Sequence, residues 1–257
     1  MPRTARAVSN TGYYHVVMKG NGNQLIFEED ADRRFYLERL MQNTAENDVA
    51  IIAWCLMDNH VHLCLREEGE AMGAHLASSM QSLMTGYAMR FNWRTGHEGH
   101  VFKDRYASRP IEDSQYLLAA VRYIHNNPVK AGICAARDYA WSSYSEYVLG
   151  ARLCDTGPVL EELGGVEGFV EFHNAAPDLR YEFPERRRIS DGDMLSVATA
   201  ALGGCKLDEI KAFPIPERNE KLALLRGTGL SVRQIARMTG IGKTTVARAA
   251  TSSILGH

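Results

Sequence analysis

Two histidines one residue apart, His60 and His62, are the side chains in this sequence best suited to bind a metal ion. They lie in an alternating apolar and polar run, 60–66, and the turn signal Asp58-Asn59 precedes it. This pattern predicts a β-hairpin whose second strand carries both histidines. Successive side chains alternate between the faces of a strand, so both imidazoles project from one face. Neighbouring imidazoles can bind a divalent metal when a third ligand lies opposite and positions stay open for substrate.

A predicted helix downstream carries two further side chains that such a site could use. It follows Ile111, and Asp113 or Ser114 can cap its first turn. We expect it to end before Pro128, because the residue that precedes a proline is disfavoured in helical geometry.

Tyr123 and Asn127 are four residues apart in this helix and therefore share a face. His125 is turned to nearly the opposite side, so it is not expected to join them. If the helix lies across the sheet face that carries His60 and His62, Asn127 would offer the metal an oxygen ligand and Tyr123 would bring its hydroxyl beside it. Simpler interpretations stay open: solvated or hydrogen-bonded histidines, and a core tyrosine with a bonded hydroxyl.

The elements that must position these residues follow one another in an order typical of a small α+β domain. We expect a strand over 13–19, a helix over 28–44, the hairpin, a helix over 72–93, a basic segment over 96–109 and then the helix that carries Tyr123. This order predicts a sheet with helices stacked on it.

The composition is that of a soluble globular protein. The chain has 257 residues, of which 45% are hydrophobic and 23% charged, enough for a core and two domains. No apolar run approaches the roughly 20 residues that span a bilayer, and no apolar segment follows Met1 as in a secretory signal. The five cysteines have no Cys-x-x-Cys spacing, which indicates reduced thiols. We therefore expect a cytoplasmic, nucleoid-associated protein.

Positive charge is concentrated in two zones, although the net charge is −2. Residues 90–109 hold five arginines and lysines against two acidic residues, and residues 226–257 hold five and no acidic residue. Such zones in a slightly acidic protein indicate local contact with an anion such as a phosphate backbone.

The chain resembles the REP-associated tyrosine transposases, which are relatives of the single-strand HUH transposases of small insertion sequences. The resemblance covers about residues 8–150, with its motifs in the expected order. These motifs are Tyr14-His15-Val16 with Lys19-Gly20, His60-Val61-His62, Gly99-His100-Val101-Phe102-Lys103-Asp104-Arg105-Tyr106, Tyr123-Ile124-His125-Asn126-Asn127-Pro128-Val129-Lys130-Ala131-Gly132, and Trp141-Ser142-Ser143-Tyr144. Lys19 departs from the family pattern, in which this position is often arginine. A lysine contact with a phosphate or base is less bidentate than an arginine contact.

The resemblance implies a ferredoxin-like sheet and an enzyme that cuts and joins single-stranded DNA beside a hairpin. Carried over by position, His60 and His62 would be metal ligands, Asn127 the third ligand and Tyr123 the nucleophile. The family implies Mg²⁺ or Mn²⁺, whereas imidazoles alone favour zinc, nickel or copper.

Four basic residues of the same domain are candidate DNA contacts: Lys19, Lys103, Arg105 and Arg109. A phosphate backbone would attract them, although a basic stretch is also typical of a solvated surface.

The C-terminal segment 230–248 resembles a helix-turn-helix. Ser231 can cap its first helix and Gly240 permits the turn. The second helix would present Lys243, Thr244 and Arg248 to a DNA groove, while a plain helical hairpin is the simpler alternative. We accordingly divide the chain into a catalytic domain over 1–149, a linker with short helices over 150–189, which includes Glu185-Arg186-Arg187-Arg188, and a helical DNA-binding domain over 190–257.

Taken together, these patterns predict a transposase-like nuclease and strand transferase that forms a 5′-phosphotyrosine on Tyr123. A metal-dependent phosphodiesterase that uses water, and a DNA-binding regulator without catalysis, are the alternatives. A homodimer is possible, because related enzymes can place the tyrosine helix of one subunit over the histidines of another.

Overall fold

The computed structural model describes residues 6–69, 73–175, 192–203 and 205–249. The chain divides into two compact units, Met1–Phe183 and Pro184–His257. The basic run 185–188, expected in the linker, lies outside the described residues. Within them, no helix has both the length and the apolar character needed to cross a membrane.

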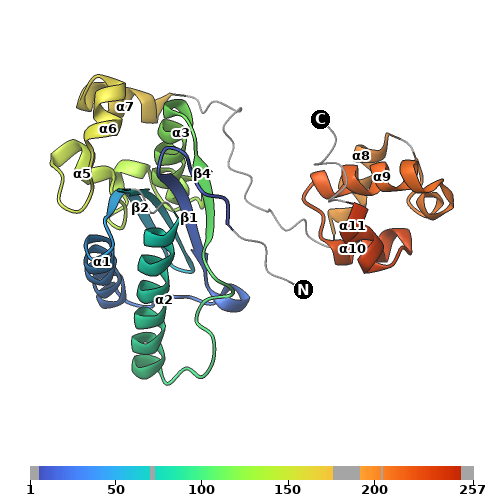
Figure 1. Ribbon diagram of the computed structural model, residues 1–257, viewed down its shortest axis with the longest axis horizontal. Coiled ribbons are helices and arrows are strands. Elements are labelled where there is room, and N and C mark those ends of the chain that lie inside the picture. Colours follow the sequence, from blue (N-terminus) through green and yellow to red (C-terminus); the bar gives the residue numbers. More distant parts are fainter. Residues whose placement is uncertain (1–5, 70–72, 176–191, 204, 250–257) are drawn as a thin grey trace. The chain divides into compact units, whose positions relative to one another are not determined.

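The first unit is built on a four-stranded antiparallel sheet (Figure 1). Its strands are β1 (Tyr13–Lys19), β2 (Val49–Met57), β3 (His60–Glu67) and β4 (Ala107–Ile111), in the order β2-β3-β1-β4. The short turn η1 (Asn21–Asn23) and helix α1 (Asp30–Ala45) connect β1 to β2, and α2 (Ala74–Thr95) connects β3 to β4. This succession and strand order are those of a ferredoxin-like fold, so the predicted α+β class is confirmed.

One face of the sheet is covered by α1 and α2. Its core includes Val16 and Met18 of β1 and Leu63 of β3, all of them completely or almost completely buried. The rings of Tyr36 on α1 and Tyr87 on α2 meet at a centroid distance of 5.3 Å. The apolar half of the alternating strands therefore faces these two helices, and the histidines face away from them.

The opposite face is covered by α3 (Ser114–His125), and a second core forms around this helix. Shorter helices extend that core: α4 (Asn127–Lys130), η2 (Ala136–Asp138), α5 (Tyr144–Leu149), α6 (Gly157–Leu163) and α7 (Val166–Asn174). Val159 of α6 and Phe169 of α7 are fully buried in it. These two helices, expected in the linker, are thus packed parts of the first unit.

Strand β4 was not predicted, because its five residues lie in the segment interpreted only as basic. Ile111 is its one buried residue, and Pro110 lacks the N–H of a ladder hydrogen bond. β4 pairs with β1 alone and forms an edge of the sheet. An edge strand tolerates a proline and can be largely exposed. β4 therefore lacks the alternating apolar pattern by which a strand is predicted.

The end of the helix near Pro128 also differs from the prediction. Helix α3 ends at His125, and α4 begins at Asn127 with the proline in its first turn, where no N–H donor is required. Pro128 therefore starts a second short helix and does not simply end the first.

The second unit consists of helices in the described residues (Figure 1). They are α8 (Met194–Leu202), η4 (Glu209–Ala212), α9 (Ile215–Gly227), α10 (Val232–Thr239) and α11 (Lys243–Ala249). Leu222, Ile235 and Val246 are fully buried in a core of this unit's own. Ser231 and Gln234 form a capping box at the start of α10, and Gly240 turns the chain with φ 66°.

Candidate active site

The histidines lie on the sheet face covered by α3. In the antiparallel register His62 pairs with Val17 and His60 pairs with Lys19, while His15 on β1 projects from the same face. His62 is 2% exposed and His15 is 4% exposed. The period of the strands thus brings three imidazoles together between the sheet and the helix.

Tyr123 lies against these histidines from α3. Its ring makes edge contacts with His62 and His15, at centroid distances of 5.4 and 5.6 Å. The helix begins at an N-cap in which Asp113 accepts a hydrogen bond from the Tyr116 N–H at 2.7 Å. The helix position that the predicted site required is therefore present within one chain.

His62 is held by a hydrogen bond on the ring nitrogen that faces β1. Its Nδ1 lies 3.0 Å from His15 Nε2, and its Nε2 is buried without a hydrogen-bond partner among the described residues. When the Nδ1–H donates to His15, the lone pair of Nε2 is available to a ligand. Burial, together with the nearby His15 and His60, holds the pKa of His62 well below its usual value, so the ring stays neutral.

His60 lies at the rim of the site. Its Nδ1 is 2.7 Å from Asn59 Oδ1, which places the proton on Nδ1 and the lone pair on Nε2. The rings of His60 and His62 are 5.0 Å apart between centroids and nearly perpendicular.

Asn127 is 4% exposed and is held against the end of α3. Its Nδ2 donates to the carbonyl oxygens of Tyr123, at 2.9 Å, and Ile124, at 3.3 Å. The amide nitrogen is thus occupied, which leaves the carbonyl oxygen Oδ1 as the end that can face a cation.

These residues fit the divalent metal that the resemblance implies. Two imidazoles and an amide oxygen form a mixed donor set, and the buried Nε2 of His62 lacks another hydrogen-bond partner in the described chain. In the described ranges there is no group of three or more His, Cys, Asp or Glu residues able to hold a metal. A metal here would therefore need Asn127 besides the two histidines.

His125 does not belong to this site. Its Nδ1 lies 3.0 Å from His173 Nε2, and its Nε2 lies 2.8 Å from Ser143 Oγ. This buried network joins α3, α5 and α7, and the helix period explains why His125 faces away from the tyrosine.

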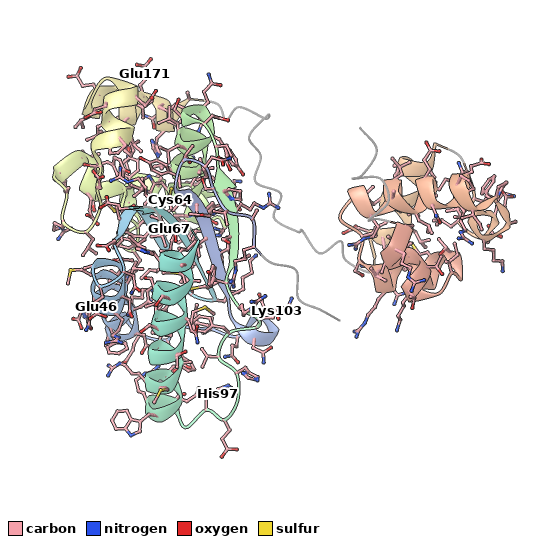
Figure 2. All side chains as sticks on the ribbon, in the orientation of Figure 1. Glu46, Cys64, Glu67, His97, Lys103 and Glu171 are labelled. Atoms are coloured by element: carbon pink, nitrogen blue, oxygen red, sulfur yellow. The ribbon has the colours of Figure 1, made fainter. Side chains whose placement is uncertain are left out.

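The four basic residues predicted in the first unit are all exposed. Lys19 pairs with His60, and Arg109 pairs with His15, so both lie on the histidine face of the sheet. Lys103 donates its backbone N–H to the Lys19 carbonyl at 2.9 Å and lies beside η1 (Figure 2). Arg105 lies two residues before the start of β4.

Two residues near the site were not singled out from the sequence. His15 was noticed only as part of a motif, although it contacts both His62 and Tyr123. The Nζ of Lys130 lies 4.1 Å from the centroid of the Tyr123 ring. No helical spacing identifies the lysine, because the chain leaves helical geometry at Asn126, between Tyr123 and Lys130.

In the second unit, Lys243, Thr244 and Arg248 are exposed on α11, while Val246 and Ala249 are buried. The same helix therefore packs on one side and presents basic and polar groups on the other.

The first unit is similar in sequence to a known protein family. Residues 8–127 match the family model described as "Transposase IS200 like". No curated protein matches the chain.

Two solved structures are similar to it. A REP-associated tyrosine transposase bound to a REP hairpin is 18% identical with a TM-score of 0.48, covering 58% of this chain and 86% of that one. A protein from Deinococcus radiodurans R1, proposed to be a transposase, is 15% identical with a TM-score of 0.33, covering 52% and 98% respectively.

Proposed function

We propose that the first unit cleaves and rejoins single-stranded DNA next to a hairpin, with Tyr123 as nucleophile. The observation that carries the proposal is the packing of the Tyr123 ring on His62, 5.4 Å between centroids, in a domain that matches the IS200-like transposase family model. Both residues belong to one chain, which supports an active site formed within a single subunit.

In the proposed step the Tyr123 hydroxyl oxygen forms a bond to phosphorus and the bond from phosphorus to the 3′ oxygen breaks. The phenol proton passes through solvent to the departing 3′ oxygen, which gives a 5′-phosphotyrosine and a free 3′-hydroxyl. The ester keeps the energy of the broken bond, so rejoining needs no ATP. A phenol with an ordinary pKa near 10 is a poor nucleophile at neutral pH and needs an activated phosphate.

His60, His62 and Asn127 would hold the metal that provides this activation. Bound Mg²⁺ or Mn²⁺ would make the phosphorus more electrophilic and stabilise negative charge on the 3′ oxygen. Lys19, Lys103, Arg105 and Arg109 would contact the DNA backbone around the site.

For the second unit we propose sequence-dependent binding of duplex DNA, such as a hairpin stem. The capping box at Ser231, the turn at Gly240 and the exposed residues Lys243, Thr244 and Arg248 support a helix-turn-helix. No acidic residue occurs between 230 and 249 to repel phosphate.

The test is adduct formation on a 3′-labelled single strand that contains a hairpin from the DNA flanking the gene, with Mn²⁺ or Mg²⁺. Wild-type protein is expected to give a labelled adduct that survives denaturing electrophoresis. Tyr123→Phe should abolish it, while Tyr116→Phe on the same helix should keep it.

Two other outcomes would each indicate a different function. Cleavage without an adduct, unchanged in Tyr123→Phe, would indicate hydrolysis by water. Tight binding without cleavage of any flanking hairpin would indicate a regulator.

A further inference from the structure

Lys130 is the last residue of α4 and its side chain is exposed, yet its ammonium group is directed to the buried nucleophile. Nζ lies 4.1 Å from the centroid of the Tyr123 ring, a cation–π contact. Tyr123 itself is only 7% exposed. A positive charge thus lies over the ring of a largely buried tyrosine.

The helix break fixes this geometry. The Lys130 N–H donates to the Asn126 carbonyl at 3.0 Å, and Asn127 is tied to the Tyr123 carbonyl at 2.9 Å. Two hydrogen bonds therefore hold the start of α4 on the end of α3, and they keep the lysine above the tyrosine.

Two further cations lie on the same sheet face. Lys19 is opposite His60 in the register of β1 and β3, and Arg109 is opposite His15 in the register of β1 and β4. Both are exposed, as Lys130 is. In the described ranges none of these three cations has an acidic side chain at ion-pair distance.

Uncompensated positive charge around a buried nucleophile is suited to an anion that arrives from solvent. An exposed cation–π contact is weak, whereas a charge-assisted hydrogen bond from an ammonium group to phosphate is strong. The ammonium group of Lys130 would therefore exchange the ring for a phosphate oxygen when DNA enters.

We propose that Lys130 is a phosphate-binding residue of the active site, which with Lys19 and Arg109 holds a single DNA strand over His62 and Tyr123. This inference rests on the proposed function for the identity of the anion. It adds a direct substrate contact at a residue whose ammonium group lies against the nucleophile's ring.

The test measures binding of an oligothymidylate to the full-length protein in the presence of a chelator, between about 50 and 200 mM salt. Each phosphate contact to a single strand contributes about 0.7 to the slope of log affinity against log salt. Lys130→Gln is expected to reduce the slope by about 0.7, and Lys130→Arg to keep it.

Arg34→Gln is the matched control, because it removes one exposed charge from α1 on the other side of the sheet. It should leave the slope unchanged, and all variants should melt at the wild-type temperature. A slope for Lys130→Gln equal to that of wild type would overturn the proposal. The contact of the lysine with the tyrosine ring would then be structural only. Wild-type protein that shows no salt-dependent binding would overturn it as well.

The binding measurement involves no cleavage, so it separates this inference from the proposed function. Adducts on Tyr123 with an unchanged Lys130→Gln slope would reject the lysine's role alone. A reduced slope without any adduct would support the phosphate contact and reject the transferase.

Discussion

At the scale of single residues, the hydrogen bond between His15 and His62 decides which ring nitrogen can bind a metal. Both rings are buried, and burial with the charge of Arg109 lowers the pKa of His15 to about 3. His15 is therefore neutral, and when its Nε2 accepts the Nδ1–H of His62, 3.0 Å away, the Nε2 lone pair of His62 is left for a ligand. Metal-bound histidines commonly have such a partner, which sets the orientation and tautomer of the ring.

We predict that His15→Phe weakens Mn²⁺ binding by about 10- to 100-fold, because the acceptor for His62 Nδ1–H is lost. Isothermal titration calorimetry of the protein without DNA measures this affinity directly. His15→Gln keeps an acceptor oxygen and should lose less. Equal Mn²⁺ affinities for wild type and His15→Phe would show that His15 does not orient the ligand.

His173 predicts a pH dependence of stability. Burial lowers its pKa to about 4, and its Nε2 accepts from His125 while its Nδ1–H donates to the Phe169 carbonyl at 2.9 Å. Between pH 6.5 and about 4 the unfolded chain binds a proton that the folded chain does not. His173 therefore removes about 1.4 kcal/mol from the free energy of unfolding for each pH unit of acidification in this window.

Urea unfolding at several pH values measures this contribution, with tryptophan fluorescence as the signal, since all three tryptophans lie in the first unit. In His173→Gln the free energy of unfolding should depend less steeply on pH below 6.5. Parallel pH profiles for the variant and wild type would contradict the neutral buried ring.

At the scale of elements, Glu146 on α5 joins β2 to the segment before α6. Its buried carboxylate accepts from Trp54 Nε1 at 3.0 Å and from the backbone N–H groups of Arg152, Leu153 and Cys154 at 2.6–2.9 Å. We predict that Glu146→Gln lowers the free energy of unfolding by about 2 kcal/mol or more, because an amide nitrogen would face N–H donors. Chemical denaturation followed by circular dichroism measures the change.

Glu162→Gln on α6 is the control, because Glu162 is exposed and its loss should cost less than about 0.5 kcal/mol. Similar losses in the two variants would mean that the carboxylate does not connect these elements.

The turn of the second unit depends on Gly240. Its φ is 66°, in the left-handed region that costs other residues about 1–2 kcal/mol, and a Cβ there would meet no atom within 4 Å. Gly240→Ala should therefore act through the backbone alone and raise amide hydrogen exchange in α10 and α11 by about 5- to 30-fold. Gly242→Ala, at a glycine equally open but without a positive φ, should leave exchange unchanged. Equal exchange in both variants would exclude the strained turn.

At the scale of the whole molecule, the features that the sequence predicted correctly depend on local periods. β1 and the hairpin follow from alternation, and the start of the helix that carries Tyr123 follows from the cap at Asp113. The contact between His15 and His62 depends on sheet register across 47 residues, which no local pattern contains. The edge strand β4 and the packing of α6 and α7 were missed for the same reason, because tertiary contacts determine them.

The two units provide the last prediction, since each has a core of its own and a separate set of exposed basic residues. Replacing Lys243 and Arg248 together by Gln should weaken duplex binding by at least about 10-fold, because contacts to DNA are lost from α11. The rate of adduct formation on Tyr123 at saturating single strand should not change.

Lys206→Gln with Lys211→Gln removes the same charge from exposed positions elsewhere in the second unit. If α11 contacts the DNA, this control pair should bind duplex nearly as wild type does, since only long-range attraction is reduced and salt screens it within about 10 Å. Equal losses in the two double variants would assign the affinity to net charge and reject the helix-turn-helix. A lower adduct rate at saturating strand would show instead that the second unit takes part in the reaction of the first.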